Sequence, residues 1–302
     1  MKREIRHIPV LLQQVLDVID PQPGQIVVDC TLGLGGHAAV LLQNISPGGR
    51  LIAIEFDAAN IALSQPILER AGGQFDISHN NFAALPNVLR ELGVDRVDAV
   101  FADLGVASPQ IDDPSRGFSY RRPGPLDMRM NTARGQSAAA LVNRMSQREL
   151  ADAILEYGDE TDANEIARLI VERRAQEPIV TTEALTAIIC EARDFTLKRA
   201  AGAKLHPAAR TFQALRILVN REMANLERLL AVLPECLKPG GMAAIISFHS
   251  GEDRRVKHAF KAGLDQGIYS QISPDVIVAD EEEIAVNGRS RSAKMRWAQL
   301  IA

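Results

Sequence analysis

The sequence predicts an α/β fold, a doubly wound parallel sheet interrupted by an all-helical insertion. Between residues 25 and 105, short apolar runs alternate with helical stretches of about ten residues, the pattern of parallel strands joined by crossover helices. From about 107 to 210 there is no convincing buried strand, only a Pro/Gly/Arg-rich loop and helical stretches. Because a strand pattern returns at 242–248, an interrupted sheet explains the chain better than two domains in tandem.

The individual elements follow from apolar spacing and from Pro and Gly boundaries. A helix is expected at 11–19, between Pro9 and Pro21, because its apolar residues fall on one helical stripe. Strands are then expected at 25–30, 51–56, 75–79 and 97–105, and helices at 37–43, 58–70 and 82–92. After the insertion we expect a long helix at 209–230, a turn at 237–241, a strand at 242–248 and a closing strand in the last ten residues.

This pattern predicts two domains. Residues 1–106 and 212–302 form the α/β domain, and residues 107–211 form the inserted helical domain, with helical stretches at 146–158 and 162–176. A chain of 302 residues is long enough for two hydrophobic cores.

Composition excludes several classes of protein. The balance of 34 Lys and Arg against 38 Asp and Glu gives a net charge of −4, which argues against a protein that coats nucleic acid by bulk charge. The 3 cysteines are widely spaced, so we expect no disulfide framework and a reducing, cytosolic compartment. No apolar stretch approaches the roughly 18 residues of a membrane span, so no membrane association is expected.

A glycine-rich loop follows the first expected strand. It runs from Thr31 to Gly36, leads into a helix, and is followed at the end of the second strand by an acid, Glu55. Glycines let the backbone approach a cofactor closely, the helix N-terminus offers free N–H groups, and an acid at this position can accept both hydroxyls of a ribose. The order strand, loop, helix, acid therefore predicts a nucleotide-cofactor site.

Two cofactors remain open at this point. The pattern Gly33-x-Gly35-x-x-Ala38 also satisfies the dinucleotide fingerprint, so an NAD(P) oxidoreductase competes with a methyltransferase. Asp29 before the loop and Asp103-Leu104-Gly105 at the end of the fourth strand favour S-adenosylmethionine, since methyltransferases place polar groups there. The sequence has no zinc-ligand spacing, hydrolase elbow or P-loop lysine, and we expect no metal.

Two basic segments could contact phosphates. Between 113 and 145, six arginines (Arg116, Arg121, Arg122, Arg129, Arg134, Arg144) stand against two acids, a local balance of +4. Residues 288–297 add +4 without an acid through Arg289, Arg291, Lys294 and Arg296. Phe118 and Tyr120 could stack on a base. The alternatives are solvated surface for the charges and core packing for the aromatics.

His249 follows the fifth strand and could face the site, or it could be a hydrogen-bonded structural histidine. Glu252 and Asp253 are expected to cap and charge the following helix.

Taken together, a set of motifs resembles the bacterial 16S ribosomal RNA cytosine-N4 methyltransferase family, also called RsmH or MraW. The set consists of His7-x-Pro9-Val10-Leu11-Leu12, Asp29-x-Thr31-Leu32-Gly33-x-Gly35-Gly36-His37, Asp103-Leu104-Gly105-Val106-x-Ser108-Pro109-Gln110, Arg116-Gly117-Phe118-Ser119, Pro125-Leu126-Asp127-Met128-Arg129-Met130, His206-Pro207-Ala208, Phe212-Gln213-Ala214-Leu215-Arg216-Ile217, Ser247-Phe248-His249-Ser250 and Arg289-Ser290-Arg291-Ser292-Ala293. The resemblance spans nearly the whole chain.

The resemblance implies a class I (Rossmann-like) S-adenosylmethionine-dependent methyltransferase sheet with an inserted all-helical domain that recognises RNA. The implied reaction is methylation of the N4 amine of a cytosine in the P-site region of 16S rRNA, in the small ribosomal subunit. The implied cofactor-binding residues are Gly35, Gly36, His37, Glu55, Phe82, Asp103 and Gln110. A homodimer is left open, and a ribosome-assembly factor that has lost turnover is the competing class.

Asp103 is the expected catalytic acceptor of an amine proton, and the alternative is that it serves only the cofactor. Other amino-methyltransferases carry an acid or amide, two prolines and an aromatic at this position, whereas this chain has Asp103-Leu104-Gly105-Val106. The chain departs from the family pattern at Gln14, Glu55, Ala107 and Gly251. Of these, Glu55 keeps the carboxylate but is one methylene longer than the expected Asp.

Overall fold

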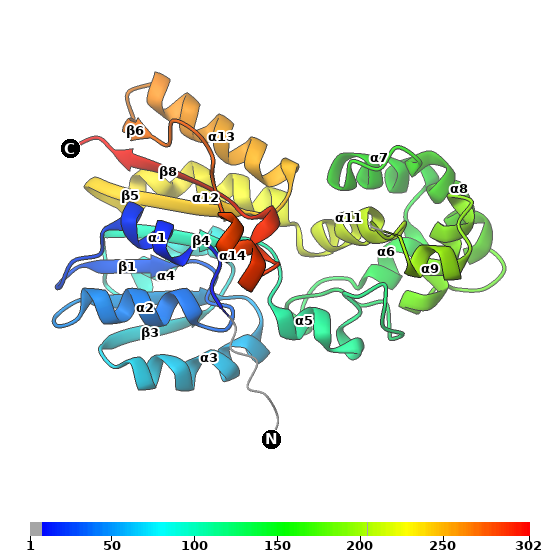
Figure 1. Ribbon diagram of the computed structural model, residues 1–302, viewed down its shortest axis with the longest axis horizontal. Helices are drawn as coiled ribbons and strands as arrows, with labels where there is room; N and C mark the ends of the chain where they lie inside the picture. The colour runs from blue at the N-terminus through cyan, green and yellow to red at the C-terminus, as the bar shows by residue number, and fades with distance from the viewer. Residues whose placement is uncertain (1–7, 204) are drawn as a thin grey trace. The chain divides into compact units, whose positions relative to one another are not determined.

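The chain folds into two compact units (Figure 1). The computed structural model describes residues 8–203 and 205–302; His7, which opens one of the family motifs, lies outside them. The sheet unit comprises residues up to 105 together with 223–302, and the helical unit comprises 106–222. The helical unit is thus an insertion within the chain of the sheet unit.

The sheet unit is built on one mixed sheet. Its strands lie in the order β3-β2-β1-β4-β5-β8-β6, and β7 pairs with β8. The first five are parallel, while β8 runs antiparallel to β5 and to β6. The strands are β1 (Ile26–Asp29), β2 (Arg50–Glu55), β3 (Gln74–His79), β4 (Val97–Asp103), β5 (Leu237–Ser247), β6 (Tyr269–Ile272), β7 (Ile277–Val278) and β8 (Lys294–Leu300).

Helices cover both faces of this sheet, as the predicted doubly wound fold requires. Alternate strand residues enter two separate cores: Val28 and Val100 pack with α4 and α12, whereas Val27 and Phe101 pack with α1 and α2. The helices are α1 (Leu12–Ile19), α2 (Gly36–Ile45), α3 (Ala58–Ala71), η1 (Phe82–Ala84), α4 (Leu85–Glu91), α12 (Glu222–Cys236), α13 (Ser250–Asp265), α14 (Glu281–Val286) and η3 (Ser290–Ser292).

The helical unit has a core of its own. Leu150, Ile154, Ile166, Ile189 and Phe212 are among its buried residues. Within the described residues of this unit, β pairing is limited to one bridge between Pro125 and Thr181. The helices are α5 (Ser108–Asp112), η2 (Pro114–Arg116), α6 (Ala138–Arg144), α7 (Gln147–Gly158), α8 (Ala163–Arg174), α9 (Thr182–Ala192), α10 (Leu197–Ala201) and α11 (Ala209–Asn220).

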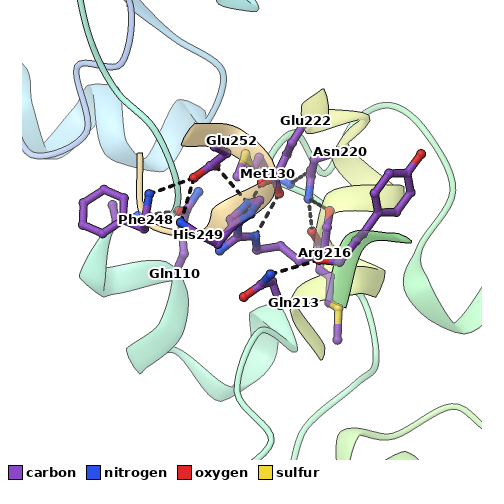
Figure 2. Close-up of polar contacts among 12 residues, drawn as sticks. Gln110, Met130, Gln213, Arg216, Asn220, Glu222, Phe248, His249 and Glu252 are labelled. Carbon is purple, nitrogen blue, oxygen red and sulfur yellow. Dashed lines mark hydrogen bonds and ion pairs between the residues drawn. The ribbon is translucent and has the colours of Figure 1, made fainter. Parts of the chain in front are cut away.

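The long helix expected at 209–230 is wrong, because the chain breaks at Arg221. This residue adopts the left-handed conformation with φ +53°, which ends α11 before α12 begins. Asn220 fixes the break: its amide donates to the Met128 carbonyl at 2.8 Å, and its side-chain oxygen accepts from the Met130 N–H at 2.8 Å (Figure 2). Because these bonds tie α11 to the 128–130 loop, α11 packs with the helical unit.

Two further expectations need correction. The turn expected at 237–241 lies inside β5: Val97 pairs with Leu237 but Ala99 pairs with Met242, so residues 238–241 bulge from the strand. The strands β6 and β7 were not predicted, because segments of 4 and 2 residues carry too little periodicity. The closing strand is confirmed as β8.

Candidate active site

The glycine loop joins β1 to α2. Gly33 and Gly35 have φ values of +51° and +77°, which favour glycine. A Cβ at Gly35 would also lie 3.2 Å from the Ser64 Cβ. The loop therefore turns directly from the end of β1 into the N-terminus of α2, and a helix N-terminus favours a polar ligand.

Glu55 connects this loop to the end of β2. One of its oxygens accepts from the Gly33 N–H at 2.8 Å and from the Asn60 amide at 3.3 Å, and the other accepts from the Asp57 N–H at 2.8 Å. Burial raises the pKa of Glu55, and these hydrogen bonds oppose the rise. A carboxylate offers about four acceptor sites, so three donors leave Glu55 able to accept a hydroxyl.

Asp29 and Asp103 end the neighbouring strands β1 and β4, where the strand order reverses and open α/β sheets bind ligands. Asp29 is 1% exposed and accepts from the Thr31 N–H at 2.9 Å. The Thr31 hydroxyl in turn accepts from the Asp103 N–H at 2.6 Å. Burial raises the pKa of Asp29 from 3.8 to about 7, and the nearby Glu55 charge adds to the rise.

Asp103 carries an acceptor that the surrounding residues leave open. Its Oδ1 is buried and has no hydrogen-bond partner among the described residues. Burial, and then the charges of Asp29 and Glu252, raise the pKa of Asp103 well above its usual range. The other oxygen, Oδ2, lies 3.7 Å from His37 Nδ1. An unused buried oxygen at the end of β4 can accept a hydrogen bond from a ligand.

Of the seven expected cofactor residues, six lie in the sheet unit and one in the helical unit. Phe82 begins η1, just after β3, and packs half-buried against the core on that face. Gln110 lies on α5, where it is 3% exposed and accepts from the Ala107 N–H at 2.8 Å. Gly35, Gly36, His37, Glu55 and Asp103 all lie at or next to the carboxyl ends of β1, β2 and β4.

The expected capping role of Glu252 is confirmed. Its carboxylate is buried and accepts from the Phe248 N–H at 2.8 Å and the His249 N–H at 3.4 Å, before the first turn of α13 (Figure 2). His249 lies at the cap of this helix, with Nε2 3.3 Å from Glu252 Oε1. Asp253 instead pairs with Arg296 on β8 at 2.6 Å.

Three of the six arginines in the first basic segment form hydrogen bonds or ion pairs with other residues of the helical unit. Arg116 donates to the Arg129 carbonyl at 2.9 Å, Arg129 forms two bonds to Asp127 at 2.7 and 2.8 Å, and Arg122 lies 3.0 Å from Asp112. The others, Arg121, Arg134 and Arg144, are exposed. The net local charge therefore overstates how much of this segment is available to phosphates.

The aromatics of this segment pack against protein groups. Phe118 is 9% exposed and belongs to the core of the helical unit. The Tyr120 ring stacks on His206, with ring centroids 4.5 Å apart, and Arg121 lies over the Tyr120 ring at 5.8 Å. These contacts favour the core-packing alternative for the aromatics.

Asn60 and Thr31 form hydrogen bonds to candidate site residues that the sequence does not predict. Asn60 lies in the first turn of α3, is 3% exposed and donates to Glu55. Thr31 was noticed only as part of a motif, although its hydroxyl links the ends of β1 and β4. The Asp57 helix cap, which accepts from the Ala59 N–H at 3.0 Å, was the available signal for Asn60.

Two further findings concern metals and membranes. In the described part of the chain, no three His, Cys, Asp or Glu side chains come together as a metal-binding group. None of the helices in residues 8–203 and 205–302 combines the length and the hydrophobicity of a membrane-spanning helix.

Known proteins match this chain from end to end. Residues 4–301 match the MraW methylase family. Relatives named ribosomal RNA small subunit methyltransferase H include one from Geobacter sp. (strain M21), 43% identical, with 99% of each chain covered. Another, from Sorangium cellulosum, is 41% identical and covers 98% of this chain and 91% of its own.

Solved structures give weaker matches. A SAM-dependent O-methyltransferase from Thermotoga maritima has a TM-score of 0.42 and 12% identity, covering 98% of this chain and 68% of its own. A SAM-dependent methyltransferase from Aquifex aeolicus has a TM-score of 0.41 and 10% identity, covering 97% and 90%.

The fold and the site together define a class of enzyme. A parallel sheet in the order 3-2-1-4-5 with an antiparallel strand beside β5, a glycine loop after β1 and an acid after β2 are the features of a Rossmann-like, S-adenosylmethionine-dependent methyltransferase. The chain belongs to the MraW methylase family. Because the chain belongs to this methylase family, the oxidoreductase interpretation that the Gly33-x-Gly35-x-x-Ala38 pattern had left open is wrong.

Proposed function

We propose that this enzyme methylates the N4 amine of a cytosine in the P-site region of 16S rRNA, in the small ribosomal subunit and in the cytoplasm. The ordered set of family motifs supports the cytosine substrate. The name shared by relatives of 41–43% identity supports the small-subunit RNA. The single observation that carries the chemistry is the buried, unpartnered Oδ1 of Asp103.

S-adenosylmethionine would be held by residues at the carboxyl ends of the strands. We assign Glu55 to the ribose hydroxyls, and the backbone of Gly35, Gly36 and His37 to the polar groups of the cofactor. Phe82, Asp103 and Gln110 complete the proposed set. When bound, the cofactor supplies a methyl group on a positively charged sulfur.

Asp103 would accept a proton from the amine. The lone pair of a cytosine amine is delocalised into the ring, so the enzyme must orient the nitrogen and accept its N–H. Oδ1 of Asp103 provides that acceptor in a buried environment, where hydrogen bonds are stronger than in water. The base must also leave its stack to reach the site, which is easiest in single-stranded RNA.

The helical unit would contact the RNA. Its exposed Arg121, Arg134 and Arg144 are the first candidates for phosphate contacts. Arg121 is the best positioned of these, because the Tyr120 ring beneath it restricts the guanidinium. Arg291, exposed on η3, is the corresponding candidate in the second basic segment.

Labelled methyl transfer tests this proposal. Small subunits from a strain that lacks its own enzyme are incubated with the protein and labelled S-adenosylmethionine, and the 16S rRNA is digested and analysed by mass spectrometry. The expected product is N4-methylcytidine. Methyl on ring carbon 5, on a ribose 2′-oxygen or only on protein contradicts the proposal.

Two variants separate a working enzyme from an assembly factor without turnover. Asp103→Asn should lower the rate by about a hundredfold or more, because an asparagine amide cannot take up the amine proton. Asp95→Asn, an exposed position just before β4, is the matched control and should keep the wild-type rate. Wild-type protein that binds subunits but transfers no methyl supports the assembly factor instead.

A further inference from the structure

The hydrogen bond of His37 fixes which of its ring nitrogens carries hydrogen. Nε2 lies 2.8 Å from the carbonyl oxygen of Val10, and both residues are buried, at 6% and 5% exposed. A carbonyl oxygen only accepts hydrogen bonds, so Nε2 must be the protonated nitrogen. The Phe101 ring, with its centroid 4.7 Å away, packs against the imidazole and restricts its orientation.

This tautomer places a lone pair opposite a carboxylate. With Nε2 protonated, a neutral His37 has its lone pair on Nδ1, which lies 3.7 Å from Asp103 Oδ2. Two acceptors cannot bond to each other unless one holds a proton. At 3.7 Å the two atoms are beyond hydrogen-bond distance, and a bond between them requires a closer approach and one proton, either on Nδ1 or on Oδ2. Such contacts are often long without substrate and shorten in the reacting complex.

The charged groups around the pair favour keeping that proton. Asp29 and Glu252 both act on Asp103 electrostatically, and Glu55 acts on Asp29. All three are carboxyl groups, and each negative charge among them favours an additional proton nearby. A positive charge on His37 opposes these charges and favours the ionised form of Asp103.

We infer that His37 is a positioning residue that carries the shared proton on Nδ1 and so keeps Asp103 ionised and ready to accept. The inference rests on the proposed function. In the reaction the nitrogen–methyl bond forms as the sulfur–methyl bond breaks, and the amine proton passes to Oδ1 of Asp103. The products are a neutral thioether, a methylated amine and a neutral Asp103 carboxyl beside a protonated His37.

NMR of the ligand-free protein tests the pair without any substrate. The chain has only 6 histidines, so nitrogen-15-labelled imidazoles can be resolved, and His37→Gln assigns the His37 signals. We expect Nε2 to carry hydrogen at every pH. In wild type we expect Nδ1 to lose its proton at a higher pH than in Asp103→Asn, by about one pH unit or more. The reason is that an adjacent carboxylate favours the protonated, positively charged imidazole. An Nδ1 titration that Asp103→Asn does not move overturns the inference.

The pH dependence of methyl transfer tests the role. His37→Gln can keep an N–H for Val10 but carries no charge, so the acid limb of the rate profile should shift to higher pH by about one unit or more. A uniform loss of rate at all pH values, with the limb unmoved, assigns His37 a structural role and refutes the inference. His258→Gln, at an exposed position on α13, is the control and should leave the profile unchanged.

These experiments separate the two proposals. If wild-type product is not N4-methylcytidine but the NMR titrations couple as expected, the proposed function fails and the His37–Asp103 proton pair stands. If the product is N4-methylcytidine and the His37 titration does not depend on Asp103, the proposed function stands and the inference about the His37–Asp103 pair is refuted.

Discussion

We expect Asp29 to make the stability of the sheet unit depend on pH, and Asp29→Asn should remove its share of that dependence. The side chain is 1% exposed, and burial raises its pKa from 3.8 to about 7. Because the folded protein binds this proton more tightly than the unfolded chain, the contribution is fully present below about pH 4 and is lost as pH rises through about 7.

The magnitude follows from the two pKa values. A rise from 3.8 to about 7 corresponds to about 4 kcal/mol of unfolding free energy lost at high pH, at about 1.4 kcal/mol per pKa unit. About 3 kcal/mol of this falls between pH 5 and pH 9. Asparagine has no charge to bury, and its oxygen can still accept from the Thr31 N–H, which lies 2.9 Å from Asp29 Oδ1.

Urea unfolding from pH 5 to pH 9 measures the effect. The single tryptophan, Trp297, lies in β8 and reports on the sheet unit by fluorescence. The stability of Asp29→Asn relative to wild type should rise by about 3 kcal/mol across this range, whereas exposed Asp95→Asn should track wild type. Parallel curves for Asp29→Asn and wild type refute the reasoning.

Three other changes give separate tests. Glu55→Ala should weaken S-adenosylmethionine binding by about 1–3 kcal/mol in calorimetry, because charged hydrogen bonds to the ribose are removed, and an unchanged Kd places the ribose acid elsewhere. Arg221→Gly should raise the urea midpoint by an amount worth about 1 kcal/mol, because a left-handed non-glycine residue is strained; a lower midpoint contradicts this. Charge reversal at exposed Arg121 and Arg134 should flatten the salt dependence of subunit binding by roughly one unit of slope for each phosphate that the variant no longer binds. Reversal at exposed Arg168, paired with Glu165 at 2.7 Å, is the control, and an equal effect there argues against a specific contact.

The sheet could be predicted because its pattern is local. Parallel strands buried on both faces produce short apolar runs, and Gly and Pro mark their ends, so β1 to β4 were found within one or two residues. The break at Arg221 has no such mark. It depends on Asn220 bonding to the 128–130 loop, about ninety residues away in sequence, and neither arginine nor asparagine signals a helix end strongly.

The candidate site likewise has a part that the sequence predicts and a part that depends on the fold. The glycine loop, Glu55 and Asp103 are recognisable because each occupies a fixed position relative to a strand end. The electrostatics could not be predicted, because the buried position of Glu252 near Asp103 requires α13 to pack at the end of β5. The arginines show the same limit: six equal charges in the sequence differ only in whether the fold supplies a partner such as Asp127.

The buried acids lie at the carboxyl ends of β1, β2 and β4, where the proposed cofactor would bind. Burial raises the pKa of Asp29 and Glu55 and so disfavours their ionised forms in the ligand-free protein. A sulfonium bound nearby favours the ionised forms, and the attraction is strongest where water is excluded. After transfer the sulfur is neutral and that attraction is gone. If the cofactor binds as proposed, the same burial would favour the charged methyl donor over its demethylated product.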